Sequence, residues 1–346
     1  MRPSFFHHLH PPTIPARQAR WSYTLGAGGI AAMLALVLGV TGILEVFYYV
    51  PTAAEAALSV QTISYLVPFG GLVRNLHYWA AQLLVLVMGV HLARVVFTGA
   101  YAPPRRFNHL LGLALLVLAV FLDFTGYVLR WDQGIQWALV VGTNLISTIP
   151  LLGPTLHVLV TGGSELGSGS SVLMRCYSWH IFGLTLLFVI LTVWHLFRVR
   201  RDGGIAVPPP SLRVDHARIS RNELVRREVL AMLLSAAALL ILSAIRPAPI
   251  AAPIVNVGAS TAEARAPWFF LWVQEMLKWG DPFLLGVLVP LVVLALLALM
   301  PYVLPLTTGR ELGQWFPRSN RTAQIVLAMI MVALGVLTIL ALIGVT

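Results

Sequence analysis

The chain has 346 residues, of which 58% are hydrophobic and only 10% are charged, and its formal net charge is +10. This composition excludes an ordinary soluble protein, because soluble domains carry about 25% charged residues. Its single cysteine, Cys176, excludes an internal disulfide and an iron–sulfur cluster bound by several cysteines of this chain, and the lack of a Cys-x-x-Cys-His motif excludes an ordinary c-type haem attachment.

Seven apolar stretches are long enough to cross a lipid bilayer as helices. We predict these spans at 24–48, 72–98, 109–130, 174–199, 228–246, 281–304 and 322–345. The expected fold is therefore that of an all-α integral membrane protein with about seven transmembrane helices. Its predicted parts are an N-terminal tail (1–21), a four-helix domain (22–200), a basic linker (201–227) and a three-helix C-terminal domain (228–346).

Arginine is concentrated in the tail and in alternate loops between the spans. The basic segments are 2–20, 105–106, 200–227 and 310–321. Because positively charged loops stay in the cytoplasm, the N-terminus is predicted inside and the C-terminus outside, as seven spans require. This distribution also accounts for the net charge, so we expect a lipid membrane as partner and no nucleic acid.

Two of the predicted spans each carry two histidines. His77 and His91 are fourteen residues apart in the second span, and His180 and His195 are fifteen apart in the fourth. At about 100° and 1.5 Å per residue, each helix presents both rings on roughly one face, about 21 Å apart. Both spans run inward, so His77 is expected level with His180 near the outer side. His91 is expected level with His195 near the inner side.

Four histidines at two depths indicate a function, because intramembrane histidines are rare. Paired neutral imidazoles can ligate two b-type haems and leave no open iron site for oxygen, which predicts a four-helix dihaem bundle. Histidines that only hydrogen-bond between helices are one alternative. A zinc site or a proton relay is another and needs carboxylates, for which Asp123 and Glu45 are the main candidates.

Glycines recur at the histidine interval. Gly28 and Gly42 are fourteen residues apart in the first span, as are Gly112 and Gly126 in the third. Glycine lets the edge of a flat ring approach a helix backbone closely, so these four are predicted to border the haems. Ordinary packing of small residues between helices is the alternative.

Two arginines lie one helical turn from the histidines. Arg74 precedes His77 by three residues, and Arg94 follows His91 by three. Each is placed to pair with haem propionates. A positive-inside anchor explains Arg94 equally well, whereas Arg74 lies on the arginine-poor side, which favours an anionic partner.

Four motifs together are similar to those of the cytochrome b/b6 family. They are Phe-Tyr-Tyr-Val-Pro-Thr at 47–52, Arg-x-x-His at 74–77, Gly-Tyr-Val-Leu-Arg-Trp-Asp-Gln at 126–133 and Ile-Pro-Leu-Leu-Gly at 149–153. The Trp-Asp-Gln motif and the fifteen-residue spacing of the second histidine pair resemble those of the b6 branch. Four spans followed by three resemble b6 joined to its subunit IV.

The resemblance implies a quinol-oxidising electron-transfer subunit of a respiratory chain, coupled to proton translocation across a bacterial cytoplasmic membrane. It implies that His77 and His180 hold an outer, lower-potential haem, and that His91 and His195 hold an inner, higher-potential one. Quinol oxidation is expected near the outer face, between 131–149 and 266–279, and quinone reduction near the inner face. The implied partners are a Rieske iron–sulfur protein, a c-type cytochrome or other electron acceptor, and a second copy of the chain.

One departure from the family concerns the outer site. The family motif there is Pro-Glu-Trp-Tyr, whereas this chain has Ala266-Pro267-Trp268-Phe269, so Trp268 is kept and the carboxylate is lost. We expect Glu275, two helical turns further on, to replace it. Because of the altered motif, a second function remains an alternative: a dihaem membrane anchor that serves another peripheral enzyme without a Rieske partner. A transporter with a histidine proton relay is the alternative from another class.

Overall fold

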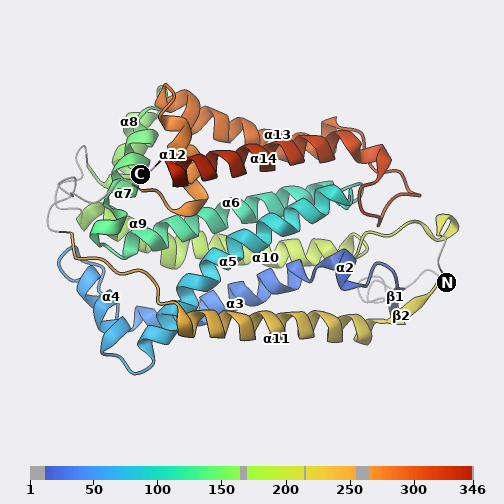
Figure 1. Ribbon diagram of the computed structural model, residues 1–346, viewed down its shortest axis with the longest axis horizontal. Helices are drawn as coiled ribbons and strands as arrows, with labels where there is room; N and C mark the ends of the chain where they lie inside the picture. The colour runs from blue at the N-terminus through green and yellow to red at the C-terminus, as the bar shows by residue number, and fades with distance from the viewer. Residues whose placement is uncertain (1–11, 164–169, 214–215, 255–264, 345–346) are drawn as a thin grey trace.

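The computed structural model describes residues 12–163, 170–213, 216–254 and 265–344. Within them, seven apolar helical spans run side by side along the long axis of the molecule (Figure 1). The spans are α3 (Ala27–Val46), α5 (Gly70–Phe97), α6 (Arg106–Leu129), α9 with α10 (Ser170–Ser178 and Leu184–Arg201), α11 (Arg221–Ile245), α13 (Val289–Val303) and α14 (Arg321–Ile343). These helices confirm the predicted all-α membrane fold with seven spans.

Short turns of other helical types extend or join the spans. The π-type turns are η2 (Trp179–Gly183), which joins α9 to α10, and η5 (Leu284–Leu288), which leads into α13. The 3-10 turns are η1 (Gln133–Ile135), η3 (Pro210–Leu212), η4 (Trp268–Phe270) and η6 (Arg318–Asn320).

A clear boundary difference is at α11, which begins at Arg221 rather than at 228. Ser220 caps this helix, because its hydroxyl oxygen accepts a hydrogen bond from the backbone nitrogen of Glu223 at 3.2 Å. The helix therefore starts with polar turns that precede the apolar stretch.

The two ends of the bundle are built differently (Figure 1). We call the end with the short helices the cap end; these are α4 (Ala56–Tyr65), α7 (Gln136–Ser147), α8 (Gly153–Thr161) and α12 (Leu271–Leu277). The opposite end, called the sheet end, carries α2 (Trp21–Thr24) and two short strands, β1 (Thr13–Pro15) and β2 (Arg218–Ser220). The C-terminal end of α14 lies at the cap end, far from β1, as an odd number of spans requires.

The two strands tie the N-terminal tail to the basic linker. They pair antiparallel, with Thr13 opposite Ser220 and Ile14 opposite Ile219. Arg218 adds side-chain hydrogen bonds to the hydroxyl and carbonyl oxygens of Thr13, both at 2.7 Å. Hydropathy carries no signal for this pairing, and residues 1–11 of the tail lie outside the described residues.

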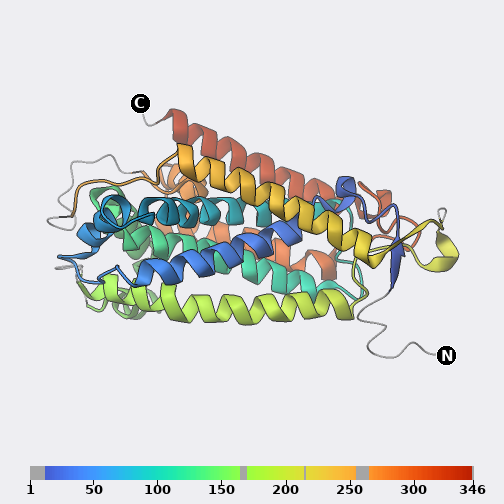
Figure 2. The same cartoon turned by 90° about the horizontal axis from the view of Figure 1, so that it is seen from below.

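The last three spans pack against the first four. Helix α3 packs on α5, α5 on α6, and α6 on α10, while α11 contacts both α3 and α5. Helix α13 contacts α6, and α14 contacts α5 and α12. Figure 2 shows α11 and α14 on one side of the bundle and α10 on the opposite side.

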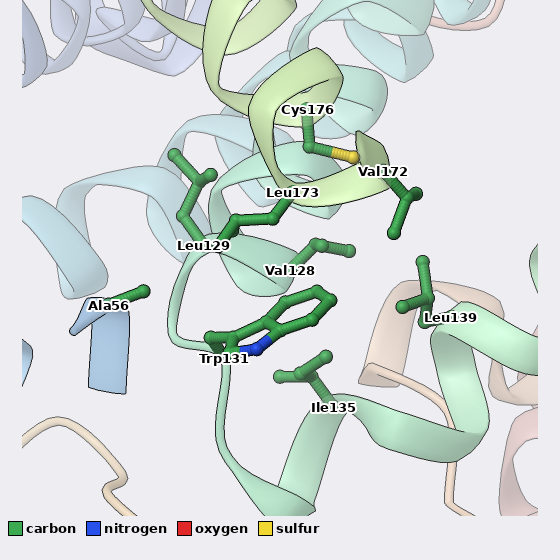
Figure 3. Packing of buried hydrophobic residues seen from close by; sticks show 9 residues of the cluster. All are labelled: Ala56, Val128, Leu129, Trp131, Ile135, Leu139, Val172, Leu173 and Cys176. Carbon is green, nitrogen blue, oxygen red and sulfur yellow. The ribbon is translucent and has the colours of Figure 1, made fainter. Parts of the chain in front are cut away.

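A buried cluster around Trp131 fastens the short helices to the spans at the cap end. Trp131 is 1% exposed and lies among apolar side chains from α4, α6, α7 and α9 (Figure 3). The members are Ala56, Val128, Leu129, Trp131, Ile135, Leu139, Val172, Leu173 and Cys176. Tyr49 packs against the cluster, and its hydroxyl donates a hydrogen bond to the carbonyl oxygen of Leu129 at 2.8 Å. The segment after α6 is thus held against the bundle by burial of apolar surface.

Candidate functional site

The structure brings the rings of His77 of α5 and His180 of η2 next to each other inside the bundle. Their ring centroids are 6.4 Å apart, and the ring planes are inclined by 64°. Two metal–nitrogen bonds of about 2.0 Å, extended to both ring centres, span roughly 6 Å. The separation therefore fits one metal ion between two imidazoles. We call His77 and His180 the cap-end pair.

The π turn explains why the second histidine spacing is longer. Fifteen residues of regular α-helix would rotate His195 by about 60° from His180. The η2 turn takes one extra residue, because its hydrogen bonds join residues five apart. The hydroxyl of Thr185, at the start of α10, donates to the carbonyl of His180 in this turn. The extra residue brings the fifteen-residue spacing into phase with the fourteen-residue spacing on α5.

Hydrogen bonds define the tautomer of His180. Its Nδ1 lies 3.0 Å from the carbonyl oxygen of Leu122 on α6. A carbonyl only accepts, so the ring hydrogen is on Nδ1 and the lone pair is on Nε2. Nε2 is therefore the atom available to a metal.

Threonine hydroxyls act on both rings of the cap-end pair. Thr41 donates to the carbonyl of Val37 at 2.7 Å, so its oxygen accepts from Nδ1 of His77 at 2.9 Å. Thr125 donates to Phe121 at 2.8 Å, and its oxygen lies 3.1 Å from Nδ1 of His180. Such partners orient metal-binding histidines. Neither threonine was predicted from the sequence, although each directly precedes one of the paired glycines.

Each of the four predicted glycines lies against one histidine ring. Among the described residues, the histidine rings directly approach these positions. A Cβ atom added at the glycine would lie 3.1 Å from Cε1 of the ring for Gly42 and His77, 2.7 Å for Gly126 and His180, 3.5 Å for Gly28 and His91, and 3.3 Å for Gly112 and His195. Glycine is thus needed most at Gly126, where a side chain would displace the ring.

The second pair, His91 and His195, lies further toward the sheet end. The two rings are close enough for their charges to interact. Nδ1 of His91 is buried and has no hydrogen-bond partner among the described residues. Those residues contain no group of three or more histidine, cysteine or acidic side chains that could hold a metal ion. A site with only two histidines suits a metal whose remaining ligands come from a cofactor and not from the protein.

Both arginines next to the histidines donate hydrogen bonds to backbone carbonyl oxygens. Arg74 is 7% exposed and donates to the carbonyls of Ala248 at 3.2 Å and Pro249 at 2.6 Å. Arg94 donates from Nε to the carbonyl of Tyr23 at 3.0 Å and stacks on its ring at 4.3 Å. A guanidinium has five N–H donors, so each arginine has donors left for an anionic group.

Arg130, which directly follows α6, forms an ion pair with a neighbouring aspartate. Its Nη2 lies 2.6 Å from Oδ2 of Asp132, and both side chains are largely buried. The same aspartate accepts hydrogen bonds from the backbone nitrogens of Gly134 and Ala251, both at 3.0 Å. The pair therefore joins the end of α6 to the loop that follows α11.

Trp268 and Glu275 lie on consecutive short elements at the cap end. Trp268 of η4 is 42% exposed and donates its indole N–H to Oε1 of Gln82 at 2.7 Å. Glu275 of α12 is 7% exposed, and its Oε2 lies 2.7 Å from Nζ of Lys278. The carboxylate expected to replace the missing family glutamate is thus held in an ion pair.

Fold and site together define a multi-pass helical membrane protein with two histidine pairs at two depths. The sequence model of the family described as Cytochrome b/b6/petB matches residues 15–203, which is more than half of the chain and includes all four histidines. The chain belongs to the cytochrome b/b6 family.

Known relatives cover different parts of the chain. Cytochrome b6 of Heliomicrobium gestii is 39% identical over 176 residues, which cover 51% of this chain and 82% of the relative. Cytochrome b6 of Tupiella akineta is 41% identical over 176 residues, which cover 51% and 81%. A chain of the solved structure titled "Hyperthermophilic respiratory Complex III" is 20% identical, with a TM-score of 0.76 over 92% of this chain and 84% of that one. This last similarity shows that the fold extends through the C-terminal spans.

Proposed function

We propose that the chain is the dihaem cytochrome b subunit of a quinol oxidoreductase. It would carry electrons between an outer quinol-oxidation site and an inner quinone-reduction site, coupled to proton translocation. The observation that carries the proposal is the cap-end pair, whose ring separation and available Nε2 of His180 suit one bis-imidazole metal.

The haem assignment follows the two histidine pairs. His77 and His180 would hold the outer haem, and His91 and His195 the inner one. A haem with two axial histidines supplies reversible one-electron transfer and leaves no iron site for oxygen. The residues fit the group, because each imidazole lies against a glycine and the pairs lie at two depths. Arg74 and Arg94 would add their remaining donors to the propionates.

The cap end would be the outer side, and the chain's own residues there would build the quinol site. In this proposal Trp268 lines the site, and Glu275 is the acidic residue expected from the sequence. The segments 131–149 and 266–279 would bind the quinol and exclude water. The parts 22–200 and 228–346 would act as the dihaem and C-terminal domains, joined by the cytoplasmic linker 201–227.

The proposed partners follow the same assignment. The chain would sit in a bacterial cytoplasmic membrane with its N-terminus in the cytoplasm, as the arginine distribution predicts. A Rieske iron–sulfur protein, a c-type cytochrome or another acceptor subunit, and a second copy of the chain would complete the complex. The fold shared with a chain from a respiratory complex III supports this assembly.

One observation favours a second candidate function. Pro267 stands where the family has glutamate, so a dihaem membrane anchor that passes electrons between quinone and a different peripheral enzyme is the alternative. Copurification decides between them, because the first function requires a Rieske protein and the second excludes it.

A redox titration of the purified complex, with haem quantified per chain, tests the proposed function. We expect two b-type haems of separate potential, one lost in His77→Ala and the other in His91→Ala. One haem would contradict the pairing of the four histidines. No haem at all would favour the transporter alternative.

A further inference from the structure

A carboxylate is buried inside the bundle without a counter-cation. Asp123 of α6 is 9% exposed, and its two oxygens accept hydrogen bonds from Nε2 of Gln82 on α5 at 2.9 and 3.2 Å. None of the five ion pairs among the described residues includes it. A lone carboxylate in a membrane interior is costly, and such residues mark functional sites.

Gln82 connects this carboxylate to the cap end. The indole N–H of Trp268 donates to Oε1 of Gln82 at 2.7 Å. Because the indole can only donate, the amide oxygen must face Trp268 and the amide nitrogen must face Asp123. The half-exposed Trp268 therefore fixes the amide that orients the buried Asp123.

The carboxylate of Asp123 can accept further hydrogen bonds. A carboxylate offers about four lone-pair positions, and a single amide nitrogen approaches this one. A ligand hydroxyl group could therefore hydrogen-bond to Asp123 without displacing Gln82. By contrast, the carboxylate of Glu275 is already compensated by Lys278.

The position of Asp123 joins the two halves of the proposed outer site. Its neighbour Leu122 supplies the carbonyl that holds His180. Its other neighbour, Phe124, packs edge to face on Phe270 of η4, with ring centroids 5.8 Å apart. Asp123 thus lies on the part of α6 that contacts both the cap-end pair and the segment that carries Trp268.

We propose that Asp123 binds a hydroxyl group of the quinol at the outer site and accepts its proton. This rests on the proposed function. The O–H bond of one quinol hydroxyl breaks, and an O–H bond forms on the Asp123 carboxylate. The other hydroxyl proton passes to water on the side of the iron–sulfur partner. That partner would take one of the two quinol electrons, and the haem that His77 and His180 would hold would take the other.

Other ionisable groups surround this part of α6 and belong to any pH profile of the site. Tyr78 faces Asp123 from α5 and also interacts with Arg74 and Arg130. Tyr127 lies one turn further along α6, close to Tyr78, and Arg130 stacks on its ring at 5.1 Å. Glu275 follows on α12 and Lys278 directly after it, next to the segment of Trp268. A variant at Asp123 must therefore be compared with variants at a second carboxylate.

The test uses the full complex in its wild-type, Asp123→Asn, Glu275→Gln and Glu223→Gln forms. Glu223 lies at the sheet end on α11, where it forms an ion pair with Arg227. Quinol is added, and haem reduction is followed by stopped-flow absorbance over a range of pH. Because a positioned proton acceptor contributes about 10²-fold or more, we expect Asp123→Asn to lower the rate by about that factor and to flatten its pH dependence. Glu223→Gln, the control outside the proposed site, should change neither. Haem content and midpoint potentials should match the wild type in all three variants.

A spectroscopic readout separates proton uptake from a merely structural role. Redox-induced infrared difference spectra of the wild type should contain a protonated-carboxyl band that Asp123→Asn lacks and Asp123→Glu restores at a shifted position. An Asp123→Asn rate within about twofold of wild type, with the same pH profile, overturns the proposal. A loss confined to Glu275→Gln overturns it in favour of Glu275.

A second variant keeps the test decisive if Asp123→Asn does not assemble. Gln82→Leu removes the amide that orients Asp123 and keeps the carboxylate, so a slower, still pH-dependent rate is expected. An unchanged rate and pH profile in Gln82→Leu counts against the proposal. Failure of the proposed function looks different, because the wild type itself would then lack haem or show no reduction by quinol.

Discussion

Nδ1 of His77 lies 2.9 Å from the hydroxyl oxygen of Thr41, whose hydrogen is donated to the carbonyl of Val37. The threonine must therefore accept from the ring, which keeps the ring hydrogen on Nδ1 and away from Nε2. A residue of α3 thus sets the ligand tautomer of a histidine on α5.

Replacing Thr41 by valine keeps the shape of the side chain and removes this acceptor. Because outer-shell partners of metal-binding histidines contribute about 10- to 100-fold in affinity, Thr41→Val should weaken retention of the outer haem by at least about tenfold. Haem per chain after extended dialysis measures this. Thr338→Val is the matched control, since Thr338 donates to the carbonyl of Leu334 on α14 at 2.7 Å. Equal haem loss in both variants would contradict the role of Thr41.

The glycines predict a graded series of alanine variants. Gly126→Ala places a Cβ 2.7 Å from the His180 ring and should displace it, so the outer haem is lost or its spectrum altered. Gly28→Ala, at 3.5 Å from His91, should keep both haems. Gly39 has no atom within 4 Å of such a Cβ, so Gly39→Ala should gain up to about 1 kcal/mol of helix stability. Haem spectra and thermal unfolding check the order, and equal effects at Gly126 and Gly28 would refute it.

Arg74 should matter for the loop after α11 as well as for any propionate. Its two hydrogen bonds to the carbonyls of Ala248 and Pro249 need the fork of a guanidinium. Arg74→Lys keeps the charge but loses one bond, with an expected cost of about 1.5–3 kcal/mol. Faster amide hydrogen exchange in residues 246–254 measures the loosened loop. Exchange at the wild-type rate would show that the loop is held by other contacts.

Tyr101 should make stability depend on pH in alkali. Its hydroxyl donates to Oδ1 of Asn320 at 2.6 Å, and burial raises the pKa of Tyr101 to about 12. Ionisation is therefore easier in the unfolded chain, whose tyrosine pKa is about 10. The stabilising contribution is complete below about pH 10 and is lost as the pH rises toward 12.

Tyr101→Phe leaves the buried Asn320 without this donor and should cost about 1–3 kcal/mol at neutral pH. The variant should also lose the part of the alkaline destabilisation that Tyr101 causes. Unfolding in detergent, measured on both sides of about pH 10, tests both effects. A variant with the alkaline profile of the wild type would show that other groups control it.

Hydropathy and residue spacing by themselves determined the spans and the depth of the histidines. A stretch that must cross a bilayer has to be long and apolar and has to satisfy its own backbone, so its position can be read locally. The pairing of His77 with His180 was predictable for the same reason, because span direction and helical rise place both at one depth.

Only the tertiary structure decided what surrounds those histidines. The π turn at 179–183 absorbs the extra residue in the second spacing, and Thr41 reaches His77 from another helix. The strand pair and the contacts among Gln82, Asp123 and Trp268 join residues far apart in the chain. Such polar contacts leave no periodic trace in a sequence, because each depends on where two distant segments meet. They determine which donor, acceptor or proton-binding group faces the site.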